Sequence, residues 1–270
     1  MKAPPVALTI AGSDSSAGAG IQADLKTFSA HGVYGVSALT CVVAEIPGRV
    51  SRIVPLDADF VSEQIALLLN GFTVAALKTG LLCTAQNVGA VASAYAAHGK
   101  DVPLVVDPVM IATSGAELLE PAAIVAYDRE LFPRATLITP NADEAARLLG
   151  RPVQTLADAR DAGRELAARY STAVLIKGGH IAGDRATDLL FCDGEIHQFS
   201  AAFTRGVSTH GTGCTYSAAI AANLASGLAL KESVAAAKEY VSLAIAQHFA
   251  WERDGHQLHA LNHAPARDAT

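Results

Sequence analysis

Short apolar runs alternate with amphipathic segments of helix length along most of this 270-residue chain. Such alternation is typical of βα units, in which parallel strands form a central sheet and helices cover both of its faces. We therefore expect a three-layer α/β fold with a mainly parallel sheet. The predicted strands are residues 6–11, 37–44, 74–78, 104–107, 136–138 and 173–177. The predicted helices are residues 21–30, 58–69, 85–97, 122–131, 142–149, 215–226 and 231–250.

One hairpin is expected at an edge of this sheet. The runs 189–192 and 196–199 flank Asp193-Gly194, a dipeptide that favours a tight turn between antiparallel strands. Because no linker or shift in composition divides the chain, we expect one domain over residues 1–255 and a loosely ordered tail over residues 256–270. His256, His259 and His263 would share one face if the tail were helical, and we expect them to be solvent-exposed.

Charge and cysteine content exclude several classes of protein. The net charge is -6 and no basic stripe is present, so nucleic acid is not an expected partner. No apolar run approaches the ~20 residues that span a bilayer, and the N-terminus lacks the pattern of a signal peptide. The four cysteines are widely spaced, which disfavours disulfides and structural zinc. We expect a soluble cytoplasmic protein.

The segment Thr209-His210-Gly211-Thr212-Gly213-Cys214 carries the sharpest chemical prediction. It leads into an apolar helix, and the first amides of a helix have no intrahelical partner and favour negative charge. Such a junction can bind a phosphate and lower the pKa of a thiol in the first turn. The alternative interpretation is a glycine-rich connection before a packing helix.

Polar residues follow several predicted strands, and the carboxyl ends of parallel strands are where ligands bind. Asp107, Asn141 and Glu144 offer the hard oxygen ligands that Mg²⁺ prefers. Asn141 and Glu144 also fit a capping box, in which both serve the helix start instead. Lys177 precedes two glycines and is expected to point at nucleotide phosphates, or else to be an ordinary surface lysine.

Several motifs in order resemble those of hydroxymethylpyrimidine and phosphomethylpyrimidine kinases. These kinases are members of the ribokinase-like superfamily, and their branch also contains pyridoxal kinases. The resemblance covers nearly the whole chain. It rests on residues 8–16, 18–28, 78–80, 107–110, 137–141 with Glu144, 177–180 and 210–214.

This resemblance implies transfer of a phosphoryl group from ATP, with Mg²⁺, to a hydroxymethyl group on a heteroaromatic ring. By similarity, the loop glycines and Thr212 form an anion hole, and Cys214 takes the place of the aspartate base of most superfamily members. The implied catalytic residues are Gly211, Thr212, Gly213 and Cys214. The implied substrate residues are Gly12, Ala19, Asp24, Val43, Glu45, Leu81 and Val109. Lys177, Asn141 and Thr209 would bind ATP, and Asp107 and Glu144 would bind the metal.

The chain departs from the family pattern at three places. Glu45 stands where the pyrimidine kinases usually carry glutamine, Leu81 replaces a common methionine, and Ala17 replaces a glycine. A carboxylate accepts hydrogen bonds but does not donate, so Glu45 suits a protonated aminopyrimidine or the phenolic hydroxyl of a pyridoxine-like ring. The leading prediction is a hydroxymethylpyrimidine/phosphomethylpyrimidine kinase. The alternatives are a pyridoxal or pyridoxine kinase and a non-catalytic ligand sensor, and a homodimer is expected by analogy.

Overall fold

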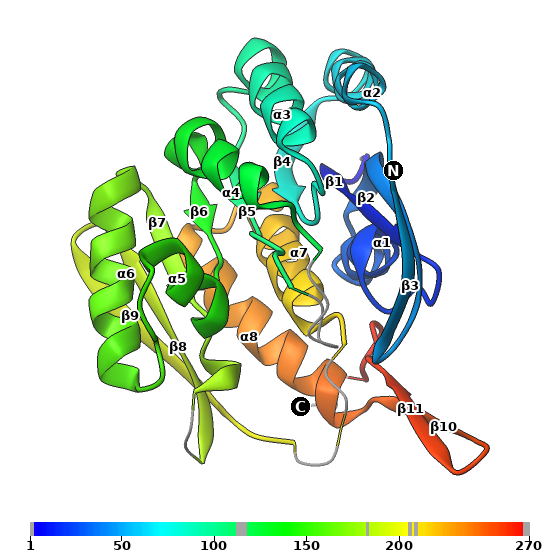
Figure 1. Ribbon diagram of the computed structural model, residues 1–270, viewed down its shortest axis with the longest axis vertical. Coiled ribbons are helices and arrows are strands. Elements are labelled where there is room, and N and C mark those ends of the chain that lie inside the picture. Colours follow the sequence, from blue (N-terminus) through cyan, green and yellow to red (C-terminus); the bar gives the residue numbers. More distant parts are fainter. Residues whose placement is uncertain (1–2, 112–117, 182–183, 205–206, 208–209, 267–270) are drawn as a thin grey trace.

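The computed structural model describes residues 3–111, 118–181, 184–204, 207 and 210–266. A nine-stranded sheet forms its middle layer, in the order β3-β2-β1-β4-β5-β6-β7-β8-β9 (Figure 1). The predicted α/β fold with helices on both faces is confirmed. The strands are β1 Val6–Asp14, β2 Tyr34–Ile46, β3 Arg49–Pro55, β4 Val74–Thr79, β5 Leu104–Val106, β6 Leu137–Ile138, β7 Ala173–Ile176, β8 Arg185–Cys192 and β9 Glu195–Ala202.

The centre of the sheet is parallel and its margins are antiparallel. Strand β1 pairs in parallel with β2 and β4, and the parallel pairing continues from β4 through β7. Strands β3, β8 and β9 pair antiparallel with their neighbours. Helices cover both faces of the parallel strands, which explains why β5 is apolar and buried along its whole length.

Two apolar layers hold the helices to the sheet. Leu104 and Val106 of β5 belong to one layer and Val105 to the other, because successive side chains of a strand point to opposite faces. One layer carries the helices α2 to α6, and the other carries α1, α7 and α8. The helices are α1 Gly20–Ala30, α2 Ala58–Gly71, α3 Ala85–His98, α4 Pro121–Ala126, α5 Ala142–Leu149, α6 Leu156–Tyr170, α7 Thr212–Ala225 and α8 Leu230–Ala246.

The observed elements differ from the predicted ones in a few places. The predicted helix 122–131 is α4 followed by a π-helical turn, Tyr127–Leu131. Helix α6 and strand β3 were not predicted. A capping box of Thr155 and Asp158 opens α6, and this pattern was a usable signal. The predicted edge hairpin is confirmed: Asp193 and Gly194, both with positive φ, join β8 to β9.

The C-terminal region corrects two expectations. Helix α8 ends at Ala246, and the chain continues into an antiparallel hairpin of β10 Phe249–Arg253 and β11 His256–Ala260. The predicted tail therefore begins inside a paired strand, not a loose or helical segment. His259 and His263 are each only 7% exposed, so the expectation of solvent-exposed histidines is wrong for both. None of the described helices combines the length and apolar character needed to cross a membrane.

Candidate active site

A cavity of about 650 Å³ opens beyond the carboxyl ends of the parallel strands, beside the start of α7. It brings together residues from positions far apart in the sequence. Predicted site residues that line it are Gly12, Ala19, Val43, Glu45, Leu81, Asp107, Val109, Asn141, Glu144, Lys177, Gly211, Thr212, Gly213 and Cys214. Thr209 lies outside the described residues. Asp24 does not line the cavity.

The start of α7 has the geometry of an anion site. Its N-cap, Gly211, has a φ of +82°, and a Cβ there would lie 1.8 Å from the carbonyl oxygen of Gly18. The first intrahelical bond runs from the amide of Thr215 to the Gly211 carbonyl, 2.9 Å away, and no side chain caps the helix. The amides before Thr215 therefore have no intrahelical partner and are available to an anion in the cavity.

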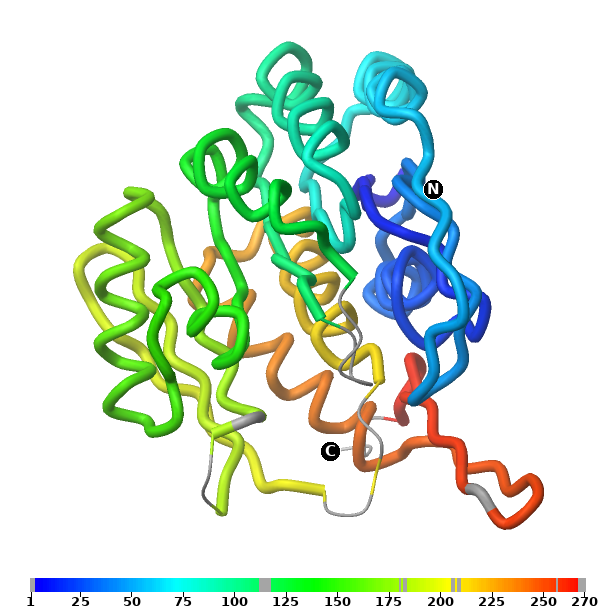
Figure 2. The backbone as a smooth tube through the Cα atoms, in the orientation of Figure 1, coloured from blue at the N-terminus to red at the C-terminus, as the bar shows by residue number. Residues whose placement is uncertain are grey.

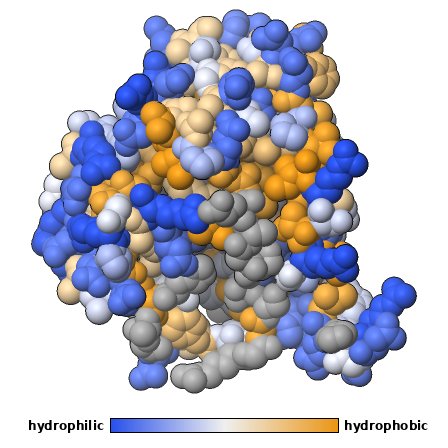
Figure 3. All heavy atoms as spheres, viewed as in Figure 1, coloured by the Kyte–Doolittle hydropathy of each residue, from blue (hydrophilic) through white to orange (hydrophobic). Residues whose placement is uncertain are grey.

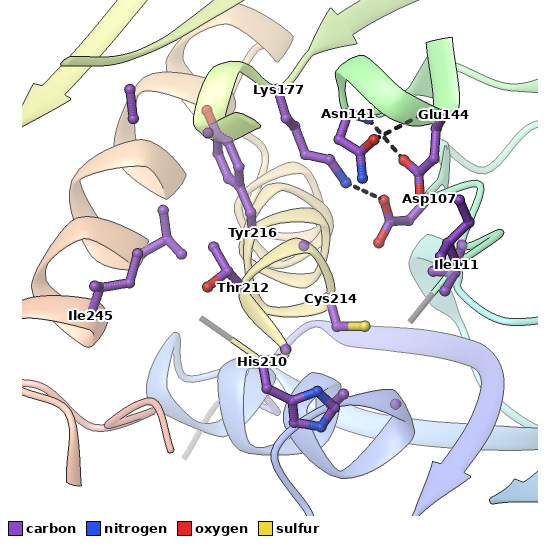
Figure 4. Close-up of a pocket in the computed structure, with 18 of the residues that line it drawn as sticks. Asp107, Ile111, Asn141, Glu144, Lys177, His210, Thr212, Cys214, Tyr216 and Ile245 are labelled. Atoms are coloured by element: carbon purple, nitrogen blue, oxygen red, sulfur yellow. Dashed lines mark hydrogen bonds and ion pairs between the residues drawn. The ribbon is translucent and has the colours of Figure 1, made fainter. Parts of the chain in front are cut away.

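A lysine and a carboxylate face this helix end (Figure 4). Lys177 Nζ lies 2.6 Å from Asp107 Oδ1, which also accepts a bond from Thr139 Oγ1 at 2.9 Å. Burial opposes ionisation of Asp107, but Lys177 and Lys78 outweigh it and lower its pKa. A Cβ on Gly213 would lie 3.1 Å from Lys177 Nζ, so the glycine leaves room for the ammonium beside the amides. Lys177 thus holds its ammonium group at the cavity, beside the start of α7.

The capping-box interpretation of Asn141 and Glu144 is confirmed, and both residues also line the cavity. Each side chain accepts a hydrogen bond from the other residue's backbone amide at 2.8 Å. Burial raises the pKa of Glu144 to about 7, with a contribution from Asp107 that Lys177 opposes. The pair therefore places a carboxyl group next to Asp107, where added positive charge would favour its ionised form.

Cys214 lies in the first turn of α7, between Asp107 and His210 in the close-up view. The expected lowering of its pKa is wrong. Burial raises the pKa of the thiol to about 11, and Asp24 and Asp107 add to that effect. Lys78 and the Gly20 amide act in the opposite direction but do not outweigh it. The sequence showed that the thiol lies near a helix start. It did not show the burial or the carboxylates that raise the pKa, because Asp24 and Asp107 come from distant segments.

Asp24 belongs to a sealed ion pair below the cavity. Its carboxylate lies 2.8 Å from Lys78 Nζ and accepts a bond from Thr9 Oγ1 at 2.6 Å. The side chains of Asp24 and Lys78 are both 0% exposed. Burial raises the pKa of Asp24, whereas Asp24 raises that of Lys78 against the effect of burial. The structure therefore puts Asp24 in contact with Lys78 and Thr9 instead of with the space for a substrate.

Asp14 organises the loop that faces α7, a role that the sequence analysis did not assign. Its Oδ2 accepts bonds from the amides of Gly18 and Ala19 and lies 3.1 Å from His210 Nε2. Burial opposes ionisation, but hydrogen bonds from His210 and Ser16 lower the pKa of Asp14 to about 2. An aspartate before a Ser-Ser-Ala-Gly turn was the signal that could have revealed it.

Glu45 adds a second carboxyl group to this wall of the cavity. Burial and the charge of Asp14 raise its pKa to about 6, against the opposing effect of His210.

Ala17, which replaces a family glycine, adopts a φ of +59°. Glycine takes up that conformation without the steric cost that a Cβ brings.

The opposite end of the cavity was not predicted. Strand β9 and helices α7 and α8 contribute to it, with Tyr216 on α7 and the apolar side chains of Val241 and Ile245 on α8. Lys238 Nζ lies 2.7 Å from Asp188 Oδ2 and 5.9 Å from the centre of the Tyr216 ring. No short motif marks this end, because its residues come together only when α8 packs beside β9.

Comparison with known proteins identifies the family. A family model described as phosphomethylpyrimidine kinase matches residues 14–259. The chain belongs to the phosphomethylpyrimidine kinase family. It is accordingly a phosphotransferase with the ribokinase-like fold, as the sequence motifs predicted.

Relatives within this kinase family carry two kinds of name. The hydroxymethylpyrimidine/phosphomethylpyrimidine kinase of Rhizobium meliloti is 45% identical over 243 residues, which cover 89% of this chain and 90% of the relative. The pyridoxine kinase of Bacillus subtilis is 41% identical over 249 residues, with 90% and 91% coverage. The structure of a Staphylococcus aureus pyridoxal kinase with AMP-PCP and pyridoxal superposes with a TM-score of 0.86 at 34% identity, covering 99% of this chain and 96% of that one.

Proposed function

We propose that this kinase uses ATP to phosphorylate 4-amino-5-hydroxymethyl-2-methylpyrimidine and its monophosphate, as in thiamine biosynthesis. The observation that carries the proposal is the placement of Lys177 beside the free amides at the start of α7, in a cavity lined by residues of both halves of the sheet. A phosphoryl group held there would have one end of the cavity on each side. Similar proteins are named hydroxymethylpyrimidine/phosphomethylpyrimidine kinases, which supports the hydroxymethylpyrimidine as the alcohol that is phosphorylated.

Each end of the cavity suits a different ligand. The apolar surface of Val241 and Ile245, with Lys238 nearby, suits a nucleotide base and its sugar. At the other end, Gly12, Val43, Leu81 and Val109 form a small apolar space for a methylated ring. The helix-start amides and Lys177 would then neutralise the group in transfer, which is the main source of acceleration in phosphoryl transfer.

Cys214 is assigned as the group that receives the proton of the substrate hydroxyl. Its pKa of about 11 makes the thiolate a minor species near neutral pH, but a strong base when formed. The proton would pass from the hydroxyl oxygen to the thiolate Sγ as that oxygen bonds to the γ-phosphorus of ATP. The bond from that phosphorus to the bridging oxygen would break in the same step, and ADP would leave. Positioning and charge neutralisation carry the rest of the acceleration, so Cys214→Ser should lower kcat much more than it weakens ATP binding.

Asp107 and Glu144 fit the requirements of a Mg²⁺ site. Both are buried carboxylates at the cavity, and burial raises the pKa of Glu144 to about 7, so a bound cation would favour its ionised form. Mg²⁺ would neutralise phosphate oxygens when bound. Lys177 and Thr139 already bond to one oxygen of Asp107, so water-mediated contacts to the ion suit this pair best.

The deciding experiment measures steady-state phosphorylation by Mg-ATP of hydroxymethylpyrimidine, its monophosphate, pyridoxal and pyridoxine. We expect a preference for the two pyrimidines and a large loss of kcat in Cys214→Ser with little change in ATP affinity. Turnover in Cys214→Ser equal to that of the natural protein would remove the base assignment. ATP binding without phosphorylation of any of the four alcohols would favour a ligand sensor.

Glu45 supports pyridoxal or pyridoxine as the second candidate substrate, because its carboxylate can accept from a phenolic hydroxyl. Glu45→Gln separates the two candidates. Since the pKa of Glu45 is about 6, the carboxylate form that suits the pyridine predominates above that pH. At pH 8 the variant should lower KM for the pyrimidine and raise it for pyridoxine. Unchanged KM values for both alcohols would show that Glu45 does not select the ring.

We further propose that the kinase is a homodimer, supported by an apolar patch on β2, β3 and α2. Val42, Ile46, Val54 and Phe60 are all between 44% and 52% exposed, and Val42 faces Val54 across the strand pair. Apolar side chains gather along this side of the molecule in Figure 3. Light scattering coupled to size exclusion should give twice the chain mass, and Val54→Glu should give monomers.

A further inference from the structure

The C-terminal segment after β11 packs behind the start of α7. Figure 2 follows the chain from α8 through the hairpin into this last described stretch, residues 261–266. Here the side chain of His263 reaches Thr215, the residue next to Cys214 in the sequence: His263 Nε2 lies 3.1 Å from Thr215 Oγ1. Thr215 is 0% exposed and His263 is 7% exposed, so water does not compete strongly for this bond.

The first turn of α7 needs support from outside the helix. A capping side chain would occupy the amides that the anion site uses, and the N-cap position is instead a glycine without a side chain. Two contacts hold the residues before the turn: Gly211 against the Gly18 carbonyl, and His210 to Asp14. His263 supplies a third contact, on the opposite side of Cys214 along the chain.

His263 is itself held firmly enough to act as a support. Its carbonyl accepts a bond from Tyr240 OH at 2.7 Å, and the amide of Asn262 donates to the Ala244 carbonyl at 3.2 Å. Gln247 makes two bonds to Ala266, of 2.9 and 2.8 Å. These anchors all lie on or just after α8, so the segment links α8 to the first turn of α7. The match to the family model ends at residue 259, before this segment begins.

The charge state of the imidazole suits this contact. Burial lowers the pKa of His263 to about 4, and the nearby ammonium of Lys26 acts in the same direction. A hydrogen bond to the backbone of Leu261 opposes both effects. Tyr240, the other titratable group in contact, donates to the backbone carbonyl and not to the ring. The ring is therefore neutral near pH 7, and Nε2 can accept a hydrogen bond from the Thr215 hydroxyl.

We propose that His263 is a positioning residue for the phosphoryl-transfer site, and that residues 261–266 belong functionally to that site. Through Thr215, His263 fixes the first turn of α7 and with it the Cys214 thiol and the anion-binding amides. This inference rests on the proposed function, because it assigns that turn to catalysis. Displacement of a reacting group by about 1 Å can cost on the order of 10²-fold in rate, so a missing support should lower turnover.

The test compares His263→Leu, which removes the bond, with His263→Gln, which keeps a polar atom able to reach Thr215. Gln247→Ala is the matched control, because it cuts an anchor of the same segment without touching α7. We expect His263→Leu to lower kcat by about tenfold or more with KM for the alcohol within twofold, as expected for misplaced catalytic groups. His263→Gln should recover most of kcat. Gln247→Ala should lower kcat much less than His263→Leu, because Tyr240 and Ala244 still hold the segment.

Two further measurements separate positioning from simple loss of structure. The rate of Cys214 alkylation by iodoacetamide should change much more in His263→Leu than in Gln247→Ala. Thr215→Val combined with His263→Leu should lower kcat no further than either change alone. A kcat within twofold of the natural value in His263→Leu, or equal losses in His263→Leu and Gln247→Ala, would overturn the proposal. If the natural protein phosphorylates none of the alcohols, the proposed function fails, and the alkylation rates still decide whether His263 positions this turn.

Discussion

Two lysine–aspartate pairs of similar geometry have different surroundings in this kinase. Lys78 is the second-last residue of the parallel strand β4, in Lys-Thr-Gly, and Lys177 directly follows β7, in Lys-Gly-Gly. Their ammonium groups lie 2.8 and 2.6 Å from the carboxylates of Asp24 and Asp107. The first pair is 0% exposed on both sides, whereas Lys177 is 12% exposed and faces the cavity. A local sequence motif therefore does not say whether such a lysine can meet a ligand.

The origin of the carboxylate makes the difference. Asp24 comes from α1, which covers one face of the sheet, so its pair with Lys78 is closed between helix and sheet. Asp107 follows β5 at the rim, where the strands end and the cavity begins. Burial raises the pKa of Asp24, whereas the two neighbouring lysines lower that of Asp107 in spite of burial. The closed pair serves the fold, and the open pair can serve an anion.

Breaking the closed pair should have the largest effect on stability. Lys78→Met leaves Asp24 buried without its counter-charge and should cost about 3–5 kcal/mol of unfolding free energy. Urea unfolding followed by circular dichroism measures the loss. The double variant Lys78→Met/Asp24→Leu is the control, and it should recover much of the stability because no buried charge is left unpaired. A loss below about 1 kcal/mol in Lys78→Met would place this pair with exposed ion pairs.

Breaking the open pair should affect catalysis more than folding. Lys177→Met removes the cation beside the anion-binding amides and should lower kcat by about 10²-fold. Folding should suffer less, because Asp107 keeps the bond from Thr139 and the nearby charge of Lys78. Steady-state kinetics and urea unfolding of the same preparation give both values. Lys177→Arg keeps the charge and should retain more activity than Lys177→Met. Near-normal turnover in Lys177→Met would mean that the amides bind the phosphoryl group without help.

The two pairs also influence Cys214, and Asp24→Asn measures the contribution of the closed one. Asp24 raises the pKa of the thiol while Lys78 lowers it, so loss of the Asp24 charge should move the pKa downward from about 11. The pH dependence of iodoacetamide alkylation reports this shift. Alkylation of the Cys214→Ser variant gives the background rate that comes from the other three cysteines. An unchanged or higher midpoint would show that Asp24 does not influence the thiol at this distance.

The smallest expected effects come from the threonine that supports each carboxylate. Thr9 donates to Asp24 at 2.6 Å, and Thr139 donates to Asp107 at 2.9 Å. Thr9→Val should lower unfolding free energy by about 1–3 kcal/mol, because it leaves a buried charge with one bond fewer. Thr139→Val should cost less stability, since Asp107 lies at the cavity and keeps its bond to Lys177. Similar losses in thermal or urea unfolding would contradict the distinction between a closed and an open pair.

Most of the fold was predictable because its signals are local. Runs such as Leu104–Val106 are apolar throughout, as strands covered on both faces must be, and Asp193-Gly194 specified its own hairpin turn. Helix α6 was overlooked although Thr155 and Asp158 marked its start. The hairpin of β10 and β11 was harder to predict, because every residue of β10 is exposed and no alternating apolar pattern identifies it.

The sequence by itself determined which residues gather at the rim, because parallel strands end at one edge and the residue after each strand is readable from the chain. It also placed a helix start at this glycine-rich segment, although the helix begins at Thr212, three residues before the predicted start at 215. It identified the family for the same reason, since both predictions depend on local motifs. Only the tertiary structure decided that Asp24 is sealed with Lys78, that the Cys214 thiol has a raised pKa, and that His263 lies against Thr215. Burial and electrostatic interaction depend on distances between segments far apart in the sequence, and those distances exist only once the chain has folded.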